Sequence, residues 1–377
     1  MRNMKCRVVE FIANMSDGGA QALIRDYARL IDKEKFEMYI VTIYPSPQSA
    51  NYALAKQYGA KVISLYKKYG IIEKLFNRCC GSYLIRKRII RMINDLKPDC
   101  IHIHLNVLKY FERISKELDG IRLYYTCHNE PDVYFSGANL EERMAAKELI
   151  CHNGLRLIAL HDEMRNQLNM MFNVSNTVVV KNGIDIERFQ NVHEDRKVIR
   201  NSLEIGEEKY VIGHVGRFSP QKNHAFLLNI FAEILKENQH AHLLLIGDGP
   251  MENEVKERIE KMALTEKVTI LSHRSDIPRL LKAMDCFVFP SIHEGLPLSV
   301  VEAQAAGLKC VISNKITKEC MLTSNIIMLP LEETAEKWAK TIMENKRIDK
   351  SEDRLDSFDM KNVISNLEDL YRTGNIG

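Results

Sequence analysis

The strongest constraint on the fold is the alternation, along almost the whole chain, of short apolar runs with longer segments of helical period. Short runs rich in Val, Ile, Leu and Phe are typical of strands buried on both faces, which occur in parallel sheets. We expect such strands at residues 7–12, 38–43, 61–65, 100–104, 122–126, 155–159 and 177–180, and then at 210–215, 242–246, 268–271, 286–289, 309–312 and 326–329. Strands separated by helices predict stacked βαβ units, and hence an α/β protein.

The length of the chain divides this pattern into two domains. With 377 residues, the chain exceeds what one hydrophobic core commonly supports. The alternation lapses into a polar stretch between residues 182 and 205 and then resumes. We therefore predict one domain over residues 1–190, a second over residues 200–355, and a terminal segment, 356–377, that ends in a helix with no strand after it.

Charge and cysteine content restrict the partners and the compartment. A formal net charge of +3 is too small to indicate a nucleic-acid partner. The nine Cys form no C-x-x-C pair, and several stand inside apolar runs, as expected of buried thiols in a reducing compartment. The first residues lack an apolar signal core, and no stretch approaches the roughly 20 apolar residues that span a bilayer. We expect a cytoplasmic protein that is at most peripheral to a membrane.

A first candidate site follows the expected strand at 210–215. Gly216 relaxes the turn, Arg217 offers a planar fork suited to phosphate, and Lys222 adds a point charge where we expect the first turn of a helix. Taken alone, two cations in such a loop are more often solvated surface residues.

A second and more specific group follows the expected strand at 286–289. Glu294 lies in the loop and Glu302 lies about one turn into the next helix, so both carboxylates can line one ligand. Gly295 allows close backbone approach, and the amides from Gly295 to Ser299 face the mouth of the sheet, where α/β folds bind ligands. Glu302 alone would be an ordinary early-turn residue favoured by the helix dipole.

Together these residues resemble the signature of the retaining glycosyltransferase family 4. Glu294-x(7)-Glu302, with Arg217 and Lys222 upstream, carries the resemblance, and the segments Val180-Lys-Asn-Gly-Ile-Asp and Leu245-Ile-Gly-Asp-Gly-Pro support it. The resemblance implies the GT-B architecture, two Rossmann-like domains with parallel sheets facing across a cleft. Residues 1–190 would then bind the acceptor and residues 200–355 the nucleotide sugar, with the segment 356–377 packing back on the N-terminal domain.

The resemblance also implies a role for each matching residue. Arg217 and Lys222 would hold the donor diphosphate, while Glu302 would bind the ribose hydroxyls. Glu294 would contact the transferred sugar, and the loop around Arg274 would border the nucleobase. The implied catalytic residues are His128, Glu294, Arg217 and Lys222, and the implied donor-binding residues are Gly18, Gly19, Gly216, Arg217, Lys222, Arg274, Glu294, Gly295, Leu296, Pro297, Leu298 and Glu302.

Two features of the N-terminal half complete this implied site. Gly18 and Gly19 precede an expected helix and resemble the family's glycine loop, although such a pair alone is usually a tight turn. His128 follows the strand at 122–126, at the family position whose imidazole reaches the donor sugar. His102 and His104 share one face of a strand, as metal ligands can, but no third ligand stands at a recognisable spacing. Packing or hydrogen bonding is therefore the favoured interpretation of this pair.

No metal and no cofactor are expected. Departure of a nucleoside diphosphate leaves about two negative charges that fixed cations, helix N-termini or a divalent metal must stabilise. Metal-dependent glycosyltransferases commonly use an Asp-x-Asp pair, and this chain contains none. Retention of anomeric configuration follows from the resemblance alone; no pair of residues suggests double displacement, so the departing phosphate would act as the base.

The expected substrates are a nucleotide sugar, with UDP favoured, and a glycan or lipid-linked acceptor. The sequence is similar to family members that build bacterial capsular or extracellular polysaccharide. Residues 66–91 carry many cations interleaved with apolar residues, which fits either contact with the inner face of an anionic membrane or a solvated helix face.

Two other classes of protein remain open at this stage. A Rossmann oxidoreductase would need a G-x-G-x-x-G fingerprint, which neither Gly18-Gly19 nor the segment Gly213–Gly216 supplies. A non-catalytic nucleotide-sugar-binding protein would keep the C-terminal residues but lack a working acceptor face, against which His128 and the glycine loop argue mildly.

Overall fold

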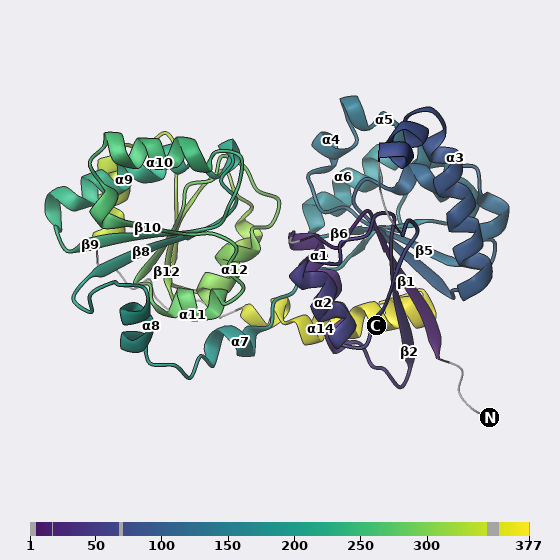
Figure 1. The fold of residues 1–377 in the computed structure, drawn as a ribbon, viewed down its shortest axis with the longest axis horizontal. Helices are drawn as coiled ribbons and strands as arrows, with labels where there is room; N and C mark the ends of the chain where they lie inside the picture. The colour runs from purple at the N-terminus through teal and green to yellow at the C-terminus, as the bar shows by residue number, and fades with distance from the viewer. Residues whose placement is uncertain (1–4, 17, 68–70, 345–353, 377) are drawn as a thin grey trace. The chain divides into compact units, whose positions relative to one another are not determined.

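The computed structural model describes residues 5–16, 18–67, 71–344 and 354–376, except for the side chains of residues 71–82, 133 and 138. The chain forms two compact units (Figure 1), Met1–Gly183 with Met360–Gly377, and Ile184–Asp359. The chain enters the second unit earlier than residue 190, the expected end of the first domain. The reason is that α7 (Ile186–Gln190) packs against α12 (Leu298–Ala305).

The first unit contains a parallel sheet of seven strands in the order β3-β2-β1-β4-β5-β6-β7. The strands are β1 (Cys6–Ile12), β2 (Phe36–Thr42), β3 (Lys61–Ser64), β4 (Cys100–His104), β5 (Arg122–Thr126), β6 (Arg156–Ala159) and β7 (Val178–Val179). Every strand predicted in this half is confirmed to within two residues. The chain builds the sheet outward from β1 in one direction and then from β4 in the other, so the order reverses between β1 and β4.

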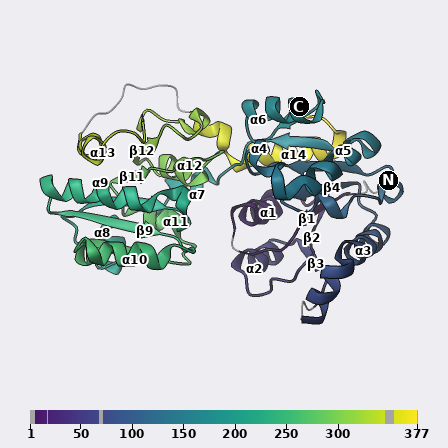
Figure 2. The same ribbon diagram turned by 90° about the horizontal axis from the view of Figure 1, so that it is seen from above.

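Helices cover both faces of this sheet (Figures 1 and 2). The larger core cluster joins the sheet to α3 (Ile71–Leu96), α5 (Leu140–Asn153) and α6 (Asp162–Phe172). On the other face α1 (Gly19–Leu30) contacts α2 (Ala50–Gln57) and the terminal helix α14 (Met360–Thr373), which also contacts β1. Val363, Leu367 and Leu370 of α14 are buried at helical spacing, so the terminal helix packs on the first unit by an apolar stripe.

The second unit contains a parallel sheet of six strands in the order β10-β9-β8-β11-β12-β13. The strands are β8 (Tyr210–Val215), β9 (Ala241–Ile246), β10 (Val268–Leu271), β11 (Cys286–Phe289), β12 (Lys309–Ser313) and β13 (Ile326–Leu329), again as predicted to within a residue. One core cluster includes α9 (His224–Glu237), α10 (Glu252–Lys261) and α13 (Ala335–Met343), and the other includes α7, α11 (Ile277–Lys282) and α12. The order reverses between β8 and β11.

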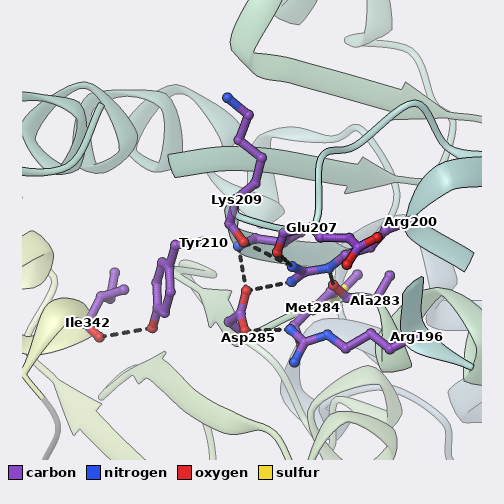
Figure 3. Close-up of polar contacts among 10 residues, drawn as sticks. Arg196, Arg200, Glu207, Lys209, Tyr210, Ala283, Met284, Asp285 and Ile342 are labelled. Atoms are coloured by element: carbon purple, nitrogen blue, oxygen red, sulfur yellow. Dashed lines mark hydrogen bonds and ion pairs between the residues drawn. The ribbon is translucent and has the colours of Figure 1, made fainter. Parts of the chain in front are cut away.

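A buried guanidinium fixes α8 (Arg196–Ser202) to the starts of β8 and β11 (Figure 3). Arg200 is 4% exposed and donates to the carbonyls of Ala283, Glu207 and Lys209 at 2.9–3.0 Å and to Asp285 Oδ2 at 2.6 Å. Asp285 Oδ2 also accepts from Val211 N at 2.7 Å. The guanidinium and its partner carboxylate are therefore satisfied together, as a buried ion pair requires.

A buried carboxyl group in the first unit lacks such compensation. Glu142 of α5 is 1% exposed, and neither of its oxygens makes a hydrogen bond of good geometry within the described residues. Burial raises the pKa of Glu142 to about 7, and the charge of Lys109 and the backbone amides of Lys109 and Leu108 oppose this rise only in part. The neighbouring Glu141 is exposed and pairs with Lys109 at 3.3 Å.

The raised pKa of Glu142 predicts a pH-dependent stability. The folded chain holds this proton more tightly than the unfolded chain, so the stabilisation is present below the ordinary glutamate pKa of 4.5 and is lost as pH rises through about 7. Between pH 4.5 and 8, the free energy of unfolding of the wild type, measured with urea, should fall by up to roughly 3 kcal/mol relative to that of Glu142→Gln. Glu141→Gln serves as the matched control, and a pH-independent difference for Glu142→Gln would contradict the prediction.

Within the described residues, none of the helices combines the length and the apolar character needed to cross a membrane.

Candidate active site

The predicted donor-binding loops follow two neighbouring strands of the second unit. β8 and β11 pair in parallel, and they flank the point where the strand order reverses. In open α/β sheets ligands bind outside the carboxyl ends of the strands at such a point. Two hydrogen bonds tie the loops together there: Ile292 N donates to Gln221 O, and Gln221 Nε2 donates to His293 O, both at 2.8 Å.

Lys222 and Glu294, predicted from separate loops, are in direct contact. Lys222 Nζ donates to Glu294 Oε1 at 2.5 Å, and the same oxygen accepts from Ser291 Oγ at 2.8 Å. The two side chains are 15% and 11% exposed, so this is a largely desolvated ion pair that still reaches solvent. The ammonium also lies over the ring of Phe289, 4.6 Å from its centroid. These contacts aim a cation and a carboxylate into the same place at the edge of the sheet.

The backbone around Lys222 differs from the expectation in one respect. Lys222 ends a short 3₁₀ turn, Pro220–Lys222, and α9 begins at His224 after Asn223 adopts a left-handed conformation. The prediction that Lys222 belongs to the first turn of the following helix is therefore wrong. Gly216 accommodates its stem, because a Cβ at Gly216 would lie 3.3 Å from Lys222 Cδ and Cε.

The remaining residues of the second candidate group, from Glu294 to Glu302, lie along one continuous segment. Glu294 forms an isolated bridge with Ile316, Leu296 and Pro297 are buried, and α12 begins at Leu298. Gly295 lies between them and is partly exposed. Glu302 is the fifth residue of α12 and is also partly exposed, so it stands about one turn into the helix, as predicted.

The two predicted arginines differ in how they are held. Arg217 is exposed, and its side chain makes no hydrogen bond or ion pair with the described part of the chain. Arg274 makes two parallel bonds to Asp276, at 2.7 and 2.6 Å. Next to it, His273 has a φ of 53° and pairs with Asp248 at 3.0 Å. Arg217 is thus available to an anionic ligand, whereas Arg274 is already fixed by a carboxylate.

In the first unit the predicted glycine pair begins α1. Gly18 is the N-cap residue and Gly19 is the first residue of the helix. A Cβ at Gly18 would lie 2.4 Å from Gln21 Oε1, whereas a Cβ at Gly19 would meet nothing within 4 Å. Gln21 is buried and reaches back to Asn14 and Ser16, so the close packing at Gly18 shapes the loop after β1.

His128 ends a chain of buried polar groups that spans β1, β4 and β5. His128 Nε2 lies 3.0 Å from His104 Nδ1, and His104 Nε2 lies 2.7 Å from Glu10 Oε2. His102, also on β4, contacts Tyr371 of α14 at 2.6 Å through Nδ1 and Thr126 at 2.7 Å through Nε2. Glu10, His102 and His104 are fully buried, and His128 is partly exposed. The favoured hydrogen-bonding interpretation of His102 and His104 agrees with these contacts.

The pKa values of three groups in this buried network, Glu10, His104 and His128, lie below their usual ranges. Burial raises the pKa of Glu10, but the interaction with His102 and hydrogen bonds from His102 and His104 outweigh burial and hold this pKa far below its usual range. Burial, reinforced by His102, lowers the pKa of His104 to about 4. Burial and the neighbouring His104 also hold the pKa of His128 well below its usual range. Near neutral pH, Glu10 is a carboxylate and both His104 and His128 are uncharged.

The sequence pattern did not predict a role for Glu10 or Tyr371. A carboxylate inside the apolar run Val8-Val9-Glu10-Phe11-Ile12 is a signal that could have been used, because a buried charge needs partners. Tyr371 offers no such signal, since it reaches Glu10 Oε1 at 2.8 Å from 361 positions away.

The basic segment 66–91, for which a membrane contact and a solvated helix face were both open, is described only in part. The side chains of Lys68, Lys74 and Arg78 lie outside the described residues. Arg86 bonds to Glu112 at 3.0 Å, and Arg88 stacks over the Tyr66 ring at 4.1 Å. These two cations serve intramolecular packing, whereas Lys67, Lys87 and Arg91 are exposed.

Known proteins resemble this chain both in overall sequence and in architecture. The family model described as "Glycosyltransferase Family 4" matches residues 17–188, and that described as "Glycosyl transferases group 1" matches residues 195–356. The EpsF protein of Bacillus subtilis (strain 168) is 28% identical over 91% of this chain and 88% of its own length. The UDP-Gal:alpha-D-GlcNAc-diphosphoundecaprenol alpha-1,3-galactosyltransferase of Escherichia coli is 28% identical over 62% of each chain.

The structural comparison agrees with the sequence comparison. The crystal structure of Anabaena Alr3699/HepE in complex with UDP and glucose has a TM-score of 0.76 and 19% identity, covering 97% of this chain and 99% of that one. The two parallel-sheet units therefore define a glycosyltransferase of the GT-B fold. Because the two models together match most of its length, the chain belongs to glycosyltransferase family 4.

Proposed function

We propose that the enzyme transfers a sugar, with retention of configuration, from a nucleotide-sugar donor to a glycan or lipid-linked acceptor. UDP is the favoured nucleotide. The observation that carries this proposal is the Lys222–Glu294 pair at the carboxyl ends of β8 and β11. It supplies a cation for the diphosphate and a carboxylate for the sugar at the place where α/β sheets bind ligands.

The second unit would bind the donor through residues with distinct tasks. Arg217 and Lys222 neutralise the diphosphate. The exposure of Arg217 and the three donor hydrogens of the Lys222 ammonium support this role. Glu302 accepts from the ribose hydroxyls, and the backbone at Gly295–Pro297 borders the sugar. The loop holding Arg274 borders the nucleobase. Since the two cations carry the charge of the leaving group, the reaction needs no divalent metal in this proposal.

The first unit would complete the reaction. His128 contacts the donor sugar next to the reacting carbon, and the loop at Gly18 and Gly19 approaches the phosphate and the acceptor. The departing phosphate accepts the acceptor's proton, which supports retention without a covalent enzyme intermediate. Exclusion of water from the site would protect the donor from hydrolysis.

The proposed acceptor rests on the names of relatives and on the charge of one segment. The Escherichia coli relative is named for transfer to a diphosphoundecaprenol-linked sugar, which supports a lipid-linked acceptor. The lipopolysaccharide core biosynthesis mannosyltransferase LpsB of Rhizobium meliloti (strain 1021), 30% identical over 34% of this chain, supports a role in bacterial surface polysaccharide biosynthesis. A lipid-linked acceptor lies at a membrane surface, and the exposed cations Lys67, Lys87 and Arg91 would favour contact with an anionic membrane. Binding to anionic liposomes at low salt tests this contact.

Donor binding and donor turnover test the proposal together. UDP should raise the unfolding temperature more than GDP or ADP does, because a ligand that binds the folded state stabilises it by mass action. The purified enzyme should then slowly hydrolyse the matching nucleotide sugar and release the sugar first as the donor's own anomer, as seen by NMR. Stabilisation by UDP without any turnover, with acceptor or without, would indicate the alternative function, a non-catalytic nucleotide-sugar-binding protein.

A further inference from the structure

We infer that Glu10 and His104 are positioning residues that fix the tautomer of His128, so that its Nδ1 is a hydrogen-bond acceptor for a sugar hydroxyl. The inference rests on the proposed contact between His128 and the donor sugar. It follows from the order of protons along the buried chain, because each contact constrains the next.

The order starts at Tyr371, whose hydroxyl has a single proton. That proton goes to Glu10 Oε1 at 2.8 Å, because a carboxylate can only accept. Burial raises the pKa of Tyr371 well above its usual value, so the proton stays in place. His102 Nδ1, 2.6 Å from the same hydroxyl oxygen, must therefore be a donor. Glu10 thus acts as the fixed acceptor of the network.

The second step concerns His104, between Glu10 and His128. Its Nε2 faces Glu10 Oε2 at 2.7 Å and must carry a proton, since the carboxylate has none to give. With a pKa of about 4, His104 is neutral near pH 7, so its Nδ1 has a lone pair and no proton. The contact of 3.0 Å to His128 is then a hydrogen bond that His128 Nε2 donates.

The last step defines what His128 offers to a ligand. A neutral His128 that carries its proton on Nε2 has an unprotonated Nδ1, and this atom has no partner within the described residues. The side chain is partly exposed, so a ligand can reach it. Such a nitrogen pairs with a hydroxyl, which donates, and not with a diphosphate oxygen, which only accepts. His128 Nδ1 therefore accepts a hydrogen bond from the sugar and does not bind the phosphate.

A metal ion offers another account of the same cluster. The ligand atoms of Glu10, His102 and His104 all lie within 4.8 Å of one another. Each of these ring nitrogens and carboxylate oxygens, however, already has a protein hydrogen-bond partner at 2.6–3.0 Å. The network is complete without an ion, which favours the ordered chain of protons.

Nitrogen-15 NMR of histidine-labelled wild-type enzyme tests the inference without reference to activity. We expect the His128 resonance, assigned with a His128→Gln variant, to show a pyridine-type Nδ1 and a protonated Nε2 near pH 7. A protonated Nδ1, a mixture of tautomers or an imidazolium would overturn the inference. So would one equivalent of zinc or another transition metal retained by the purified protein. The proposed function fails separately, through absence of nucleotide-sugar turnover.

A matched pair of variants tests the consequence for turnover. Glu10→Gln removes the anionic acceptor that orders the protons, and we expect His128 to lose its single tautomer. We also expect kcat to fall about 10-fold or more with UDP affinity unchanged, as when partners that orient a histidine are lost. Tyr124→Phe is the control. The hydroxyl of Tyr124 donates at 2.7 Å to the carbonyl of Leu370 in α14, the helix that carries Tyr371, but it takes no part in the hydrogen-bonded chain that leads to His128. An unchanged spectrum and kcat in Glu10→Gln would overturn the inference.

Discussion

Replacing Lys222 by alanine is expected to lower kcat/KM for sugar transfer by about 10²- to 10³-fold, the usual effect of removing one preorganised donor from a site of developing charge. The ammonium lies 2.5 Å from Glu294 and 4.6 Å from the centre of the Phe289 ring, so it is fixed before a ligand arrives. No reorganisation is then needed as the diphosphate departs. Steady-state kinetics with the donor found in the nucleotide screen measures the effect.

Two comparisons separate this effect from general damage. Lys236→Ala removes an exposed lysine of the same unit, one that pairs with Glu233, and should leave kcat/KM unchanged. Because Lys222→Ala leaves the largely desolvated Glu294 without its ion-pair partner, its unfolding midpoint should fall, and kinetics are compared at a temperature at which circular dichroism shows the variant folded. If Lys222→Ala kept wild-type kcat/KM, the assignment of this cation to the diphosphate would be wrong.

Replacing Arg200 by methionine is expected to destabilise the second unit by about 3–5 kcal/mol, the cost of removing one partner of a buried ion pair. The variant leaves the carbonyls of Ala283, Glu207 and Lys209 without their donor (Figure 3) and takes away the main cation beside Asp285. Urea unfolding, with limited proteolysis to locate the unfolded unit, measures the loss.

The matched control for this prediction is Arg196→Met. Arg196 also pairs with Asp285, but its side chain is 41% exposed, so solvent screens the pair and the loss should be about 1 kcal/mol or less. Equal losses from both variants would show that burial does not decide the importance of these pairs.

The strands were the most predictable part of the fold. Strands of a parallel sheet are covered on both faces, so β1, β4, β8 and β11 appear in the sequence as apolar runs. The exact place where the chain passes between the units was not predictable to the residue. It depends on α7 packing against α12, a contact between segments more than a hundred residues apart.

The candidate site was predictable where its residues follow strands directly. Lys222 and Glu294 meet because parallel neighbouring strands end at the same edge of the sheet, which the alternating pattern already implied. The support behind His128 was not predictable, because it joins Glu10 of β1 and Tyr371 of α14 through long-range packing. The local backbone at Lys222 was also missed, since the left-handed Asn223 breaks the expected helix.

The most direct test of diphosphate stabilisation by side-chain cations is the initial rate of donor turnover by the wild-type enzyme before and after exhaustive chelation of divalent metals. If Arg217 and Lys222 carry the charge of the leaving group, the rate in EDTA equals the untreated rate, and added Mg²⁺ or Mn²⁺ does not raise it. A rate abolished by EDTA and restored by Mg²⁺ or Mn²⁺ would contradict this account.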